Sequence, residues 1–291
     1  MSSNNKGALF PPKRSEDSQT PLQAIVLTDS YNSRFRPLTL ERPRCLLKIA
    51  NTPLIEYTFH FLALAGVKDV IVFLGAHADQ VKSYIELSEW NSDMTSPFKI
   101  RMIVSQEALS VGDAMRALDE RSLITSDFLL VSGDVIGSID MTDILKEHEK
   151  RKQTDKNAIM TMVVRETGSI HRTRAKNDMA VFAIHPHTGQ CLHYEPIEFS
   201  PTKKRITMNL EIFERVGDIE VRNDLIDCQI DVCSPEVPAL FTENFDYQEI
   251  RRDFVHGVLT SDLMGKTIYC HVVDGQYAAR IGDLATFDAV K

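Results

Sequence analysis

The sequence predicts an α/β protein: a Rossmann-like domain with a mostly parallel central sheet to which antiparallel strands are added. Two observations lead to this prediction. From residue 23 to about residue 155, short apolar runs alternate with amphipathic segments, and after residue 157 the chain changes to runs rich in β-forming residues. Strands that alternate with helices form βαβ units, whose crossovers make neighbouring strands parallel.

The first half is interpreted as four strand–helix pairs. The expected strands are AIVL (24–27), DVIVFL (69–74), IRMIVS (100–105) and FLLVSGD (128–134), and the expected helices are 53–65, 78–90, 110–121 and 141–155. We expect Thr52 to cap the first helix, with Pro53 in its first turn. Ser110 and Asp113 have the spacing of a capping box at the start of the third.

The second half is interpreted as antiparallel strands and a hairpin at the sheet edge. The expected strands are AIMTMVV (158–164), MAVFAIHP (179–186), CLHYE (191–195), CQIDVC (228–233) and TIYCHVV (267–273), with helix returning over 236–265. His185, His187, Cys191 and His193 superficially suggest a metal cluster. Because their side chains would alternate between the faces of a hairpin, we expect a hairpin tip and no metal site.

Length, charge and cysteine content limit the functional classes. The chain has 291 residues with 43% hydrophobic content, which allows a substantial core. Residues 1–22 are polar and rich in Pro, Ser and Lys, so we expect them to be a disordered tail. The folded domain is expected to span residues 23–291. A net charge of −8 argues against broad contact with nucleic acid or with an anionic membrane. Five cysteines without CxxC spacing suit free buried thiols in a reducing compartment, so the cytosol is expected.

Residues 26–53 have the frame of a phosphate-binding loop without its glycines. The strand ends at Leu27, Arg36-Pro37-Leu38-Thr39 closes a loop, and Pro43-Arg44 follows. This layout resembles the signature of sugar-phosphate nucleotidyltransferases. By that resemblance, Asp29, Ser30 and Asn32 occupy glycine positions, Arg34 the position of the catalytic arginine, and Arg44 that of a lysine.

The replaced glycines predict that nucleotide binding of the usual kind fails. Glycines let backbone N–H groups close around a triphosphate, whereas a Cβ blocks the approach. Asp29 also places a carboxylate where the polyphosphate would lie, and two anions repel each other strongly in a poorly hydrated pocket.

Two further segments match the resemblance in part. By the resemblance, Asp134, after Ser132-Gly133, stands where the family holds magnesium. A magnesium site usually needs a second carboxylate, and none can be matched in the later half of the sequence. We therefore favour a structural role for Asp134, in which it ends the strand and bonds backbone amides. Gln106–Ala114 matches the segment that contacts the base. It keeps Gly112, while Asp113 is explained by helix capping, so a structural role is favoured.

The segment 221–248 contains the candidate protein-binding residues. Arg222, Asn223 and Asp224 precede a buried-looking strand, and Asn244-Phe245 lies beside Asp246 and Tyr247. Aromatic side chains beside polar groups are typical of protein-binding surfaces. The alternative is that Phe245 packs under the helix and Asn244 caps its end.

Taken together, several runs resemble the epsilon subunits, of fungal type, of the eukaryotic translation initiation factor 2B complex. They are QAIVLTDSYNSRFRPLT, RPRCLL, PLIEYT, DFLLVSGDV, RNDLIDC and ENFDYQ. The resemblance implies a cytosolic exchange factor of five different subunits, in which epsilon pairs with gamma and exchanges guanine nucleotide on initiation factor two. It associates Asn244 and Phe245 with the substrate factor, and Arg222, Asn223 and Asp224 are a weaker candidate for the same face.

The resemblance also implies that other domains of the subunit carry part of its function. The β-helix and the C-terminal HEAT-type catalytic domain of the family do not fall within the 291 residues. We therefore expect a non-catalytic domain for assembly and docking, with no cofactor, no metal and no membrane or direct nucleic-acid partner. The alternative is an active sugar-phosphate nucleotidyltransferase that uses Arg34 and magnesium on Asp134.

Overall fold

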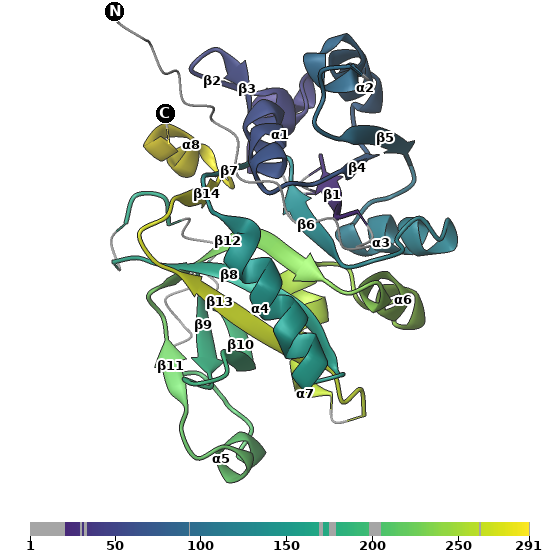
Figure 1. The fold of residues 1–291 in the computed structure, drawn as a ribbon. Coiled ribbons are helices and arrows are strands. Elements are labelled where there is room, and N and C mark those ends of the chain that lie inside the picture. The colour runs from purple at the N-terminus through teal and green to yellow at the C-terminus, as the bar shows by residue number, and fades with distance from the viewer. Residues whose placement is uncertain are drawn as a thin grey trace, which may run out of the picture.

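The computed structural model describes residues 21–29, 31, 34–92, 94–168, 171–174, 179–197, 205–261 and 263–290. Ser30 and Asn32 of the predicted loop, and residues 1–20 of the expected tail, lie outside this set. The described chain forms a ten-stranded sheet with helices on both faces (Figure 1). The predicted α/β class is confirmed.

The elements follow the predicted alternation in the first half of the chain. The strands are β1 (Gln23–Leu27), β2 (Lys48–Ile49), β3 (Thr52–Pro53), β4 (Asp69–Leu74), β5 (Lys99–Val104), β6 (Phe128–Ser132), β7 (Val135–Gly137), β8 (Ala158–Glu166), β9 (Met179–Ile184), β10 (Gln190–Ile197), β11 (Glu220–Arg222), β12 (Leu225–Cys233), β13 (Thr267–Val273) and β14 (Ala278–Arg280). The α-helices are α1 (Leu54–Leu64), α2 (Ala78–Leu87), α3 (Val111–Glu120), α4 (Met141–Thr154), α5 (Glu211–Arg215), α6 (Glu236–Glu243), α7 (His256–Thr260) and α8 (Leu284–Val290). Short 3-10 helices span Leu38–Leu40, Arg44–Leu46 and Glu89–Asn91, and a π-helix spans Ile250–Val255.

The sheet is parallel in one half and mixed in the other. Its strand order is β11-β9-β10-β13-β8-β12-β6-β1-β4-β5. Strands β6, β1, β4 and β5 are parallel to their neighbours in this run, as the βαβ pattern predicts. The β9–β10 hairpin and β11 extend one edge, as expected, but β12 lies inside the sheet, antiparallel to both β6 and β8.

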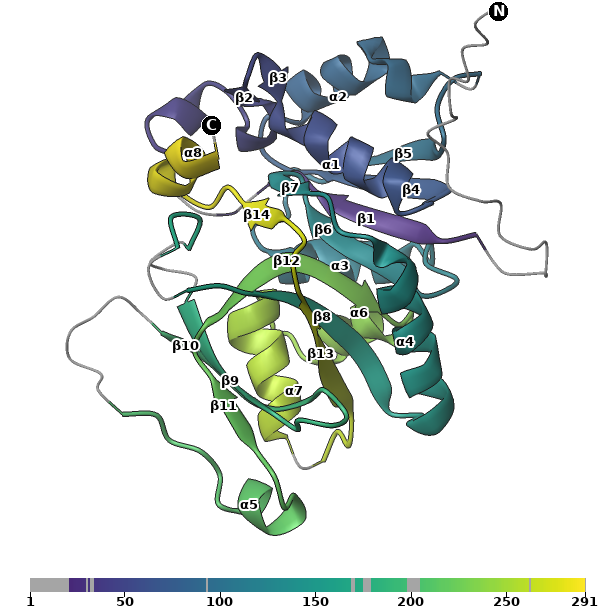
Figure 2. The same ribbon diagram turned by 60° about the vertical axis from the view of Figure 1, so that its left-hand side comes forward.

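Alternate residues of the central strands supply two hydrophobic cores, one on each face. In β1, Ile25 and Leu27 belong to the core under α3, α6 and α7, whereas Ala24 and Val26 belong to the core under α1, α2 and α4. Figure 2 shows the two helical layers on either side of the sheet. Since a strand buried on both faces reads as a continuous apolar run, AIVL was recognisable as a strand from sequence.

The helix starts differ in how well the sequence predicts them. The prediction that Thr52 caps the first helix is wrong: Thr52 and Pro53 form β3, and Pro53 takes the cap position without a side-chain hydrogen bond. At α3, the Ser110 hydroxyl accepts a hydrogen bond from the Asp113 N–H at 3.0 Å, as predicted. Both helices bury an apolar face against the sheet, which includes Phe59 and Leu62 of α1 and Leu118 of α3.

The histidine-containing segment is the predicted hairpin tip between β9 and β10. His185 and His187 lie at the turn, and His193 is buried and faces Glu195. Within the described ranges, no three His, Cys, Asp or Glu side chains gather as a metal site.

All five cysteines are free and buried, as predicted. Cys45 lies in the short helix Arg44–Leu46, and the other four lie on strands of the large sheet. Among the helices that the structure describes, none has the length and apolar character to cross a membrane.

Candidate functional site

The carboxylate of Asp29 binds one backbone amide of the degenerate loop and one from the segment that follows β4. It accepts hydrogen bonds from the N–H of Tyr31 at 3.1 Å and from the N–H of Ala76 at 2.9 Å. Gly75 makes this approach feasible, because a Cβ there would lie 2.9 Å from the Asp29 carboxylate. The Tyr31 amide, of the kind that would cradle an anion in a phosphate loop, is thus bonded to the protein's own carboxylate.

Asp134 lies just beyond β6 and is enclosed by two arginines. Its side chain is 4% exposed, forms a close ion pair with Arg44, and lies 3.4 Å from the Nε of Arg280 on β14. Arg44 is itself buried, and its guanidinium lies over the ring of Phe35. The expected role of Asp134, ending the strand and bonding backbone amides, is therefore replaced by a buried ion-pair network.

A second buried ion-pair network joins β12 to the π-helix. Arg251 donates to Asp227 at 2.9 Å and to Asp231 at 2.7 Å and 3.0 Å. Burial raises the pKa of Asp231 to about 6, although the positive charge and hydrogen bonds of Arg251 oppose the rise. Between the two carboxylates, Gln229 has a φ of 54° at an irregularity in the β12 pairing, and its side chain lines a cavity.

Two cavities share the degenerate loop as a common wall. One, of about 660 Å³, is bordered by Asp227, Gln229 and Arg280, and the other, of about 950 Å³, by Arg44 and His77. Asp29, Tyr31, Arg34 and Leu109 line both. The sequence-predicted loop residues that the structure describes are thus brought together around one site.

These residues do not fit the magnesium ion that a nucleotidyltransferase uses. Asp134 faces the guanidinium groups of Arg44 and Arg280, and Asp227, a carboxylate that lines the 660 Å³ cavity, is bound by Arg251. A hard divalent cation needs carboxylate oxygens that are open to it. Here arginine side chains already supply the positive charge.

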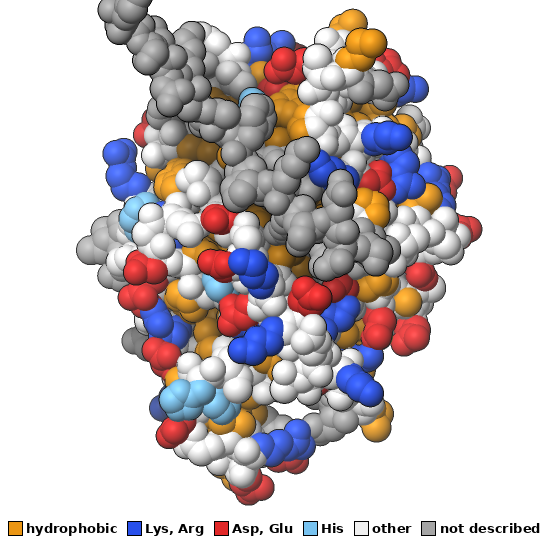
Figure 3. Space-filling view, viewed as in Figure 1, with side chains coloured by type: hydrophobic (Ala, Val, Ile, Leu, Met, Phe, Trp, Pro, Cys, Tyr) orange, Lys and Arg blue, Asp and Glu red, His pale blue; other side chains and the backbone are white. Residues whose placement is uncertain are grey.

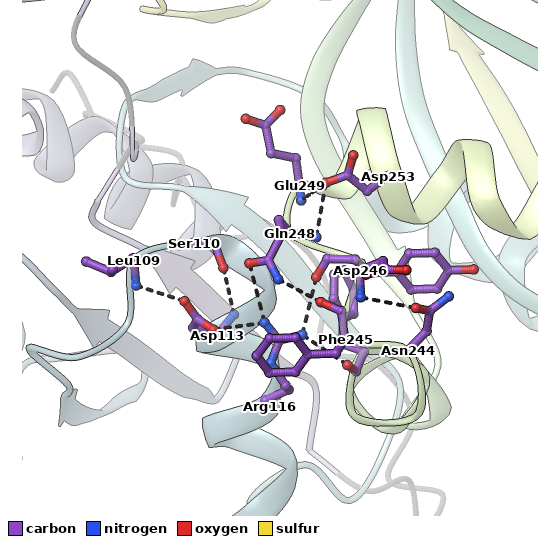
Figure 4. Close-up of polar contacts among 12 residues, drawn as sticks. Leu109, Ser110, Asp113, Arg116, Asn244, Phe245, Asp246, Gln248, Glu249 and Asp253 are labelled. Atoms are coloured by element: carbon purple, nitrogen blue, oxygen red, sulfur yellow. Dashed lines mark hydrogen bonds and ion pairs between the residues drawn. The ribbon is translucent and has the colours of Figure 1, made fainter.

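A rigid turn after α6 carries the candidate partner-binding residues. Asn244 ends α6, and its side-chain oxygen accepts a hydrogen bond from the N–H of Asp246 at 3.1 Å. Tyr247 is buried against Phe241 and Phe254. Phe245 is 70% exposed, so the alternative in which it packs under the helix is wrong, whereas the expected capping role of Asn244 is confirmed. Figure 4 shows this turn lying against α3.

Gly112 allows the turn to approach α3. Its N–H donates to the carbonyl of Gln248 at 2.9 Å, and a Cβ on Gly112 would lie 2.0 Å from the carbonyl oxygen of Tyr247. The sequence predicts that Gly112 belongs to the degenerate nucleotide pocket with a structural role. In the structure its role is close backbone packing against the turn.

Arg222, Asn223 and Asp224 lie at the other end of β12 from α6. Arg222 pairs with Asp224 at 2.7 Å and with Glu166 at 3.1 Å, and the carbonyl of Asn223 accepts from Arg174. A nine-residue strand is about 30 Å long. The structure therefore does not bring this group together with Asn244 and Phe245.

The surface charge is mixed where it can be seen. On the face in Figure 3, acidic and basic side chains are interspersed among the coloured residues. The net charge of −8 agrees with this distribution. A uniformly basic surface of the kind that contacts nucleic acid is not visible among the described residues on that face.

Sequence reasoning missed four charged residues that shape these sites: Arg116, Arg251, Asp231 and Arg280. Arg116 contacts the carbonyl oxygens of Phe241 and Tyr247 and lies over the ring of Phe245. Its one sequence signal was its place three residues after Asp113 on a helix, the spacing at which side chains meet. Arg251 and Arg280 belong to no motif.

Comparison with known proteins places the chain among nucleotidyl transferases. Residues 23–169 match the family model described as nucleotidyl transferase. The chain is 62% identical over 94% of its length to "Translation initiation factor eIF2B subunit epsilon" of Schizosaccharomyces pombe, and 44% identical over 94% to the protein of the same name from Dictyostelium discoideum. It spans 40% and 38% of these two relatives.

The fold also matches solved structures. A UDP-glucose pyrophosphorylase, solved with UDP-glucose, has a TM-score of 0.62 at 15% identity, over 93% of this chain and 97% of that one. At this level of identity the likeness concerns the fold alone.

Proposed function

The chain belongs to the nucleotidyl transferase family, and from this premise we propose that it is a non-catalytic, nucleotidyltransferase-like domain of an eIF2B epsilon subunit. In this proposal the domain serves subunit assembly and the docking of initiation factor two during guanine nucleotide exchange. The 62% identity to the S. pombe epsilon subunit supports the assignment. The exchange chemistry itself would belong to the HEAT-type domain of the subunit, outside this chain.

The observation that carries the docking proposal is the exposure of Phe245. Large aromatic side chains are normally at least partly buried, and Phe245 is 70% exposed on a turn whose neighbour Tyr247 is anchored in the core. An exposed aromatic side chain on a fixed turn is the kind of group that contributes strongly to protein binding. We assign Asn244 and Phe245 to the contact with GDP-bound initiation factor two.

The test uses the complete exchange-factor complex, with its gamma and other subunits, carrying Asn244→Ala or Phe245→Ala in epsilon. We expect Phe245→Ala to weaken binding of initiation factor two by about tenfold or more and to slow GDP release from it. Phe213→Ala is the matched control, because Phe213 is 54% exposed on α5, far from the turn. Unchanged affinity for Phe245→Ala, in a complex that assembles normally, would show that the contact lies elsewhere.

The non-catalytic part of the proposal is supported by the arginine-bound carboxylates and by Asp29. Asp134 and Asp227 are both ion-paired, and Asp29 bonds the backbone amide of Tyr31 in the degenerate loop and that of Ala76 after β4. The domain, incubated with nucleoside triphosphates, a panel of sugar phosphates and magnesium, is expected to release no pyrophosphate. Sustained release above a no-enzyme control would favour the alternative, an active sugar-phosphate nucleotidyltransferase.

Arg222, Asn223 and Asp224 stay a separate proposed contact. Because they lie at the opposite end of β12 from the Asn244–Phe245 turn, we propose that they face a sister subunit rather than initiation factor two. Asn223→Ala tests this without removing the Arg222–Asp224 pair, and reduced co-purification of gamma or another subunit is the expected result.

We propose the cytosol as the compartment, in keeping with five free thiols.

A further inference from the structure

Arg116 connects α3 to the turn that presents Phe245. One of its terminal nitrogens donates to the carbonyl of Phe241 at 3.1 Å and to the carbonyl of Tyr247 at 3.3 Å. The centre of its guanidinium lies 4.4 Å from the centroid of the Phe245 ring. A single side chain therefore contacts the end of α6, the turn backbone and the exposed aromatic ring (Figure 4).

The direction of Arg116 is itself fixed by the start of α3. Its other terminal nitrogen lies 2.8 Å from a carboxylate oxygen of Asp113, and the second oxygen of that carboxylate accepts from the N–H of Leu109 at 2.9 Å. Hydrogen bonds from Arg116, Leu109 and Ser110 outweigh the effect of burial and hold the pKa of Asp113 below its usual value. Asp113 thus stays ionised and keeps the guanidinium in place at neutral pH.

The Phe245 side of the turn is closed by a further contact. Gln248 donates its side-chain amide to the carbonyl of Phe245 at 2.7 Å, and the N–H groups of Gln248 and Glu249 donate to Asp253 at 3.0 Å and 2.7 Å. These hydrogen bonds fix the backbone around Phe245. The side chain of Phe245 could still rotate about its own bonds, and the guanidinium of Arg116 over its ring restricts this rotation. A positive charge over an aromatic face is attractive and favours one ring orientation.

We propose that Arg116 is the positioning residue that holds the ring of Phe245 in the orientation which initiation factor two recognises. This inference rests on the proposed docking function of Phe245. Fixing an exposed side chain before association removes part of the ordering cost that binding would otherwise carry. Arg116 acts on affinity through Phe245 and the turn.

The geometry requires an arginine and not only a positive charge. The guanidinium bonds two carbonyl groups and a carboxylate through its terminal nitrogens while its central carbon lies over the ring. A lysine ammonium is a compact charge without a flat face and cannot make these contacts at once. Arg116→Lys therefore keeps the charge and loses the orientation of the ring.

The test is a double-mutant cycle in the complete exchange-factor complex, read as affinity for initiation factor two. We expect Arg116→Met to weaken binding about three- to tenfold, and Arg116→Met with Phe245→Ala to bind no more weakly than Phe245→Ala alone, within about a factor of two. Losses that multiply, or wild-type affinity for Arg116→Met, would overturn the inference. Wild-type affinity for Phe245→Ala would instead mean that the docking proposal fails.

Two further variants separate positioning from folding. Arg121→Met, at the exposed C-terminal end of α3, removes an arginine from the same helix and is expected to bind like the wild type. If Arg116→Met does not assemble, Arg116→Lys takes its place in the cycle. Arg116→Lys is expected to show the same loss and the same non-additivity with Phe245→Ala, and wild-type affinity for Arg116→Lys contradicts the positioning role.

Discussion

Arg44 and Asp134 form an ion pair with both side chains buried, next to the end of β6. Their side chains are 3% and 4% exposed, and Arg280 contributes a second positive charge to Asp134. A carboxylate held in this way has its charge neutralised without a cation. The pair explains how the fold persists with an acidic residue deep in a site that no longer fits magnesium.

We expect Arg44→Met to destabilise the domain by about 3–5 kcal/mol, because it removes the closer of the two charge partners of buried Asp134 and leaves Arg280. The double variant Arg44→Met with Asp134→Leu removes both charges and should recover a large part of that loss. Urea unfolding at pH 7 measures both free energies. Equal losses in the single and double variants would show that the ion pair does not determine the effect.

Gly112→Ala should destabilise the domain, because the new Cβ would lie 2.0 Å from the carbonyl oxygen of Tyr247 and force α3 and the turn apart. A steric insertion of this kind costs about 1–3 kcal/mol or more. Gly217→Ala is the control, since a Cβ there meets nothing within 4 Å. Thermal unfolding should show a clear decrease in Tm for the first variant and little change for the second.

Arg251→Met should destabilise the domain by about 3–5 kcal/mol at pH 7.5, because Asp227 and Asp231 would remain buried without their shared counter-charge. The loss should shrink toward pH 5. Burial raises the pKa of Asp231 in the folded state, and the loss of Arg251 removes the charge that opposes this rise. The Asp231 carboxylate of the variant therefore gains a proton before that of the unfolded chain, so the stability of the variant rises as the pH falls. The exposed neighbour Arg252, changed to Met, should show neither the loss nor its pH dependence.

His148→Gln should flatten the pH dependence of unfolding below neutral pH. Burial lowers the pKa of His148 to about 4, while its Nδ1 lies 2.9 Å from the Thr161 hydroxyl. Between pH 6.5 and 4 the unfolded chain binds a proton at this histidine that the folded chain does not. The free energy of unfolding therefore decreases as the pH is lowered, by about 2 kcal/mol from pH 6.5 to 5. The variant should lose this part of the slope. Exposed His187→Gln should keep the full slope, and an unchanged slope for His148→Gln would contradict the prediction.

The strands and helices could be predicted well because their patterns are local. DVIVFL and FLLVSGD read as buried strands since both of their faces are covered, and Ser110 with Asp113 marks the start of α3 from four neighbouring residues. The place of β12 between β6 and β8 could not be predicted, because strand order depends on contacts between distant segments. Thr52 was misjudged as a cap because its pairing with Ile49 in a short hairpin competes with the helix.

The candidate site could be predicted residue by residue but not as a set of contacts. Asp29 and Arg44 were identified from the loop frame and Asp134 from its place after Ser132-Gly133, yet the pairing of Arg44 with Asp134 follows from the tertiary fold alone. Arg280 and Arg251 reach the site from the late strand β14 and the π-helix, where no motif marks them. The sequence also does not show which of the two aromatic side chains, Phe245 or Tyr247, packs into the core and which is exposed.

The five buried thiols have a practical consequence for how motions of the domain can be observed. Cys45 is held by the short helix beside Arg44, so a small alkylating reagent reaches it when that helix lifts from the pocket. Cys228, Cys233 and Cys270 sit in the middle of the sheet and become reactive only when strands separate. The ratio of the two labelling rates therefore reports, without any introduced probe, whether the vestigial pocket opens independently of the rest of the fold.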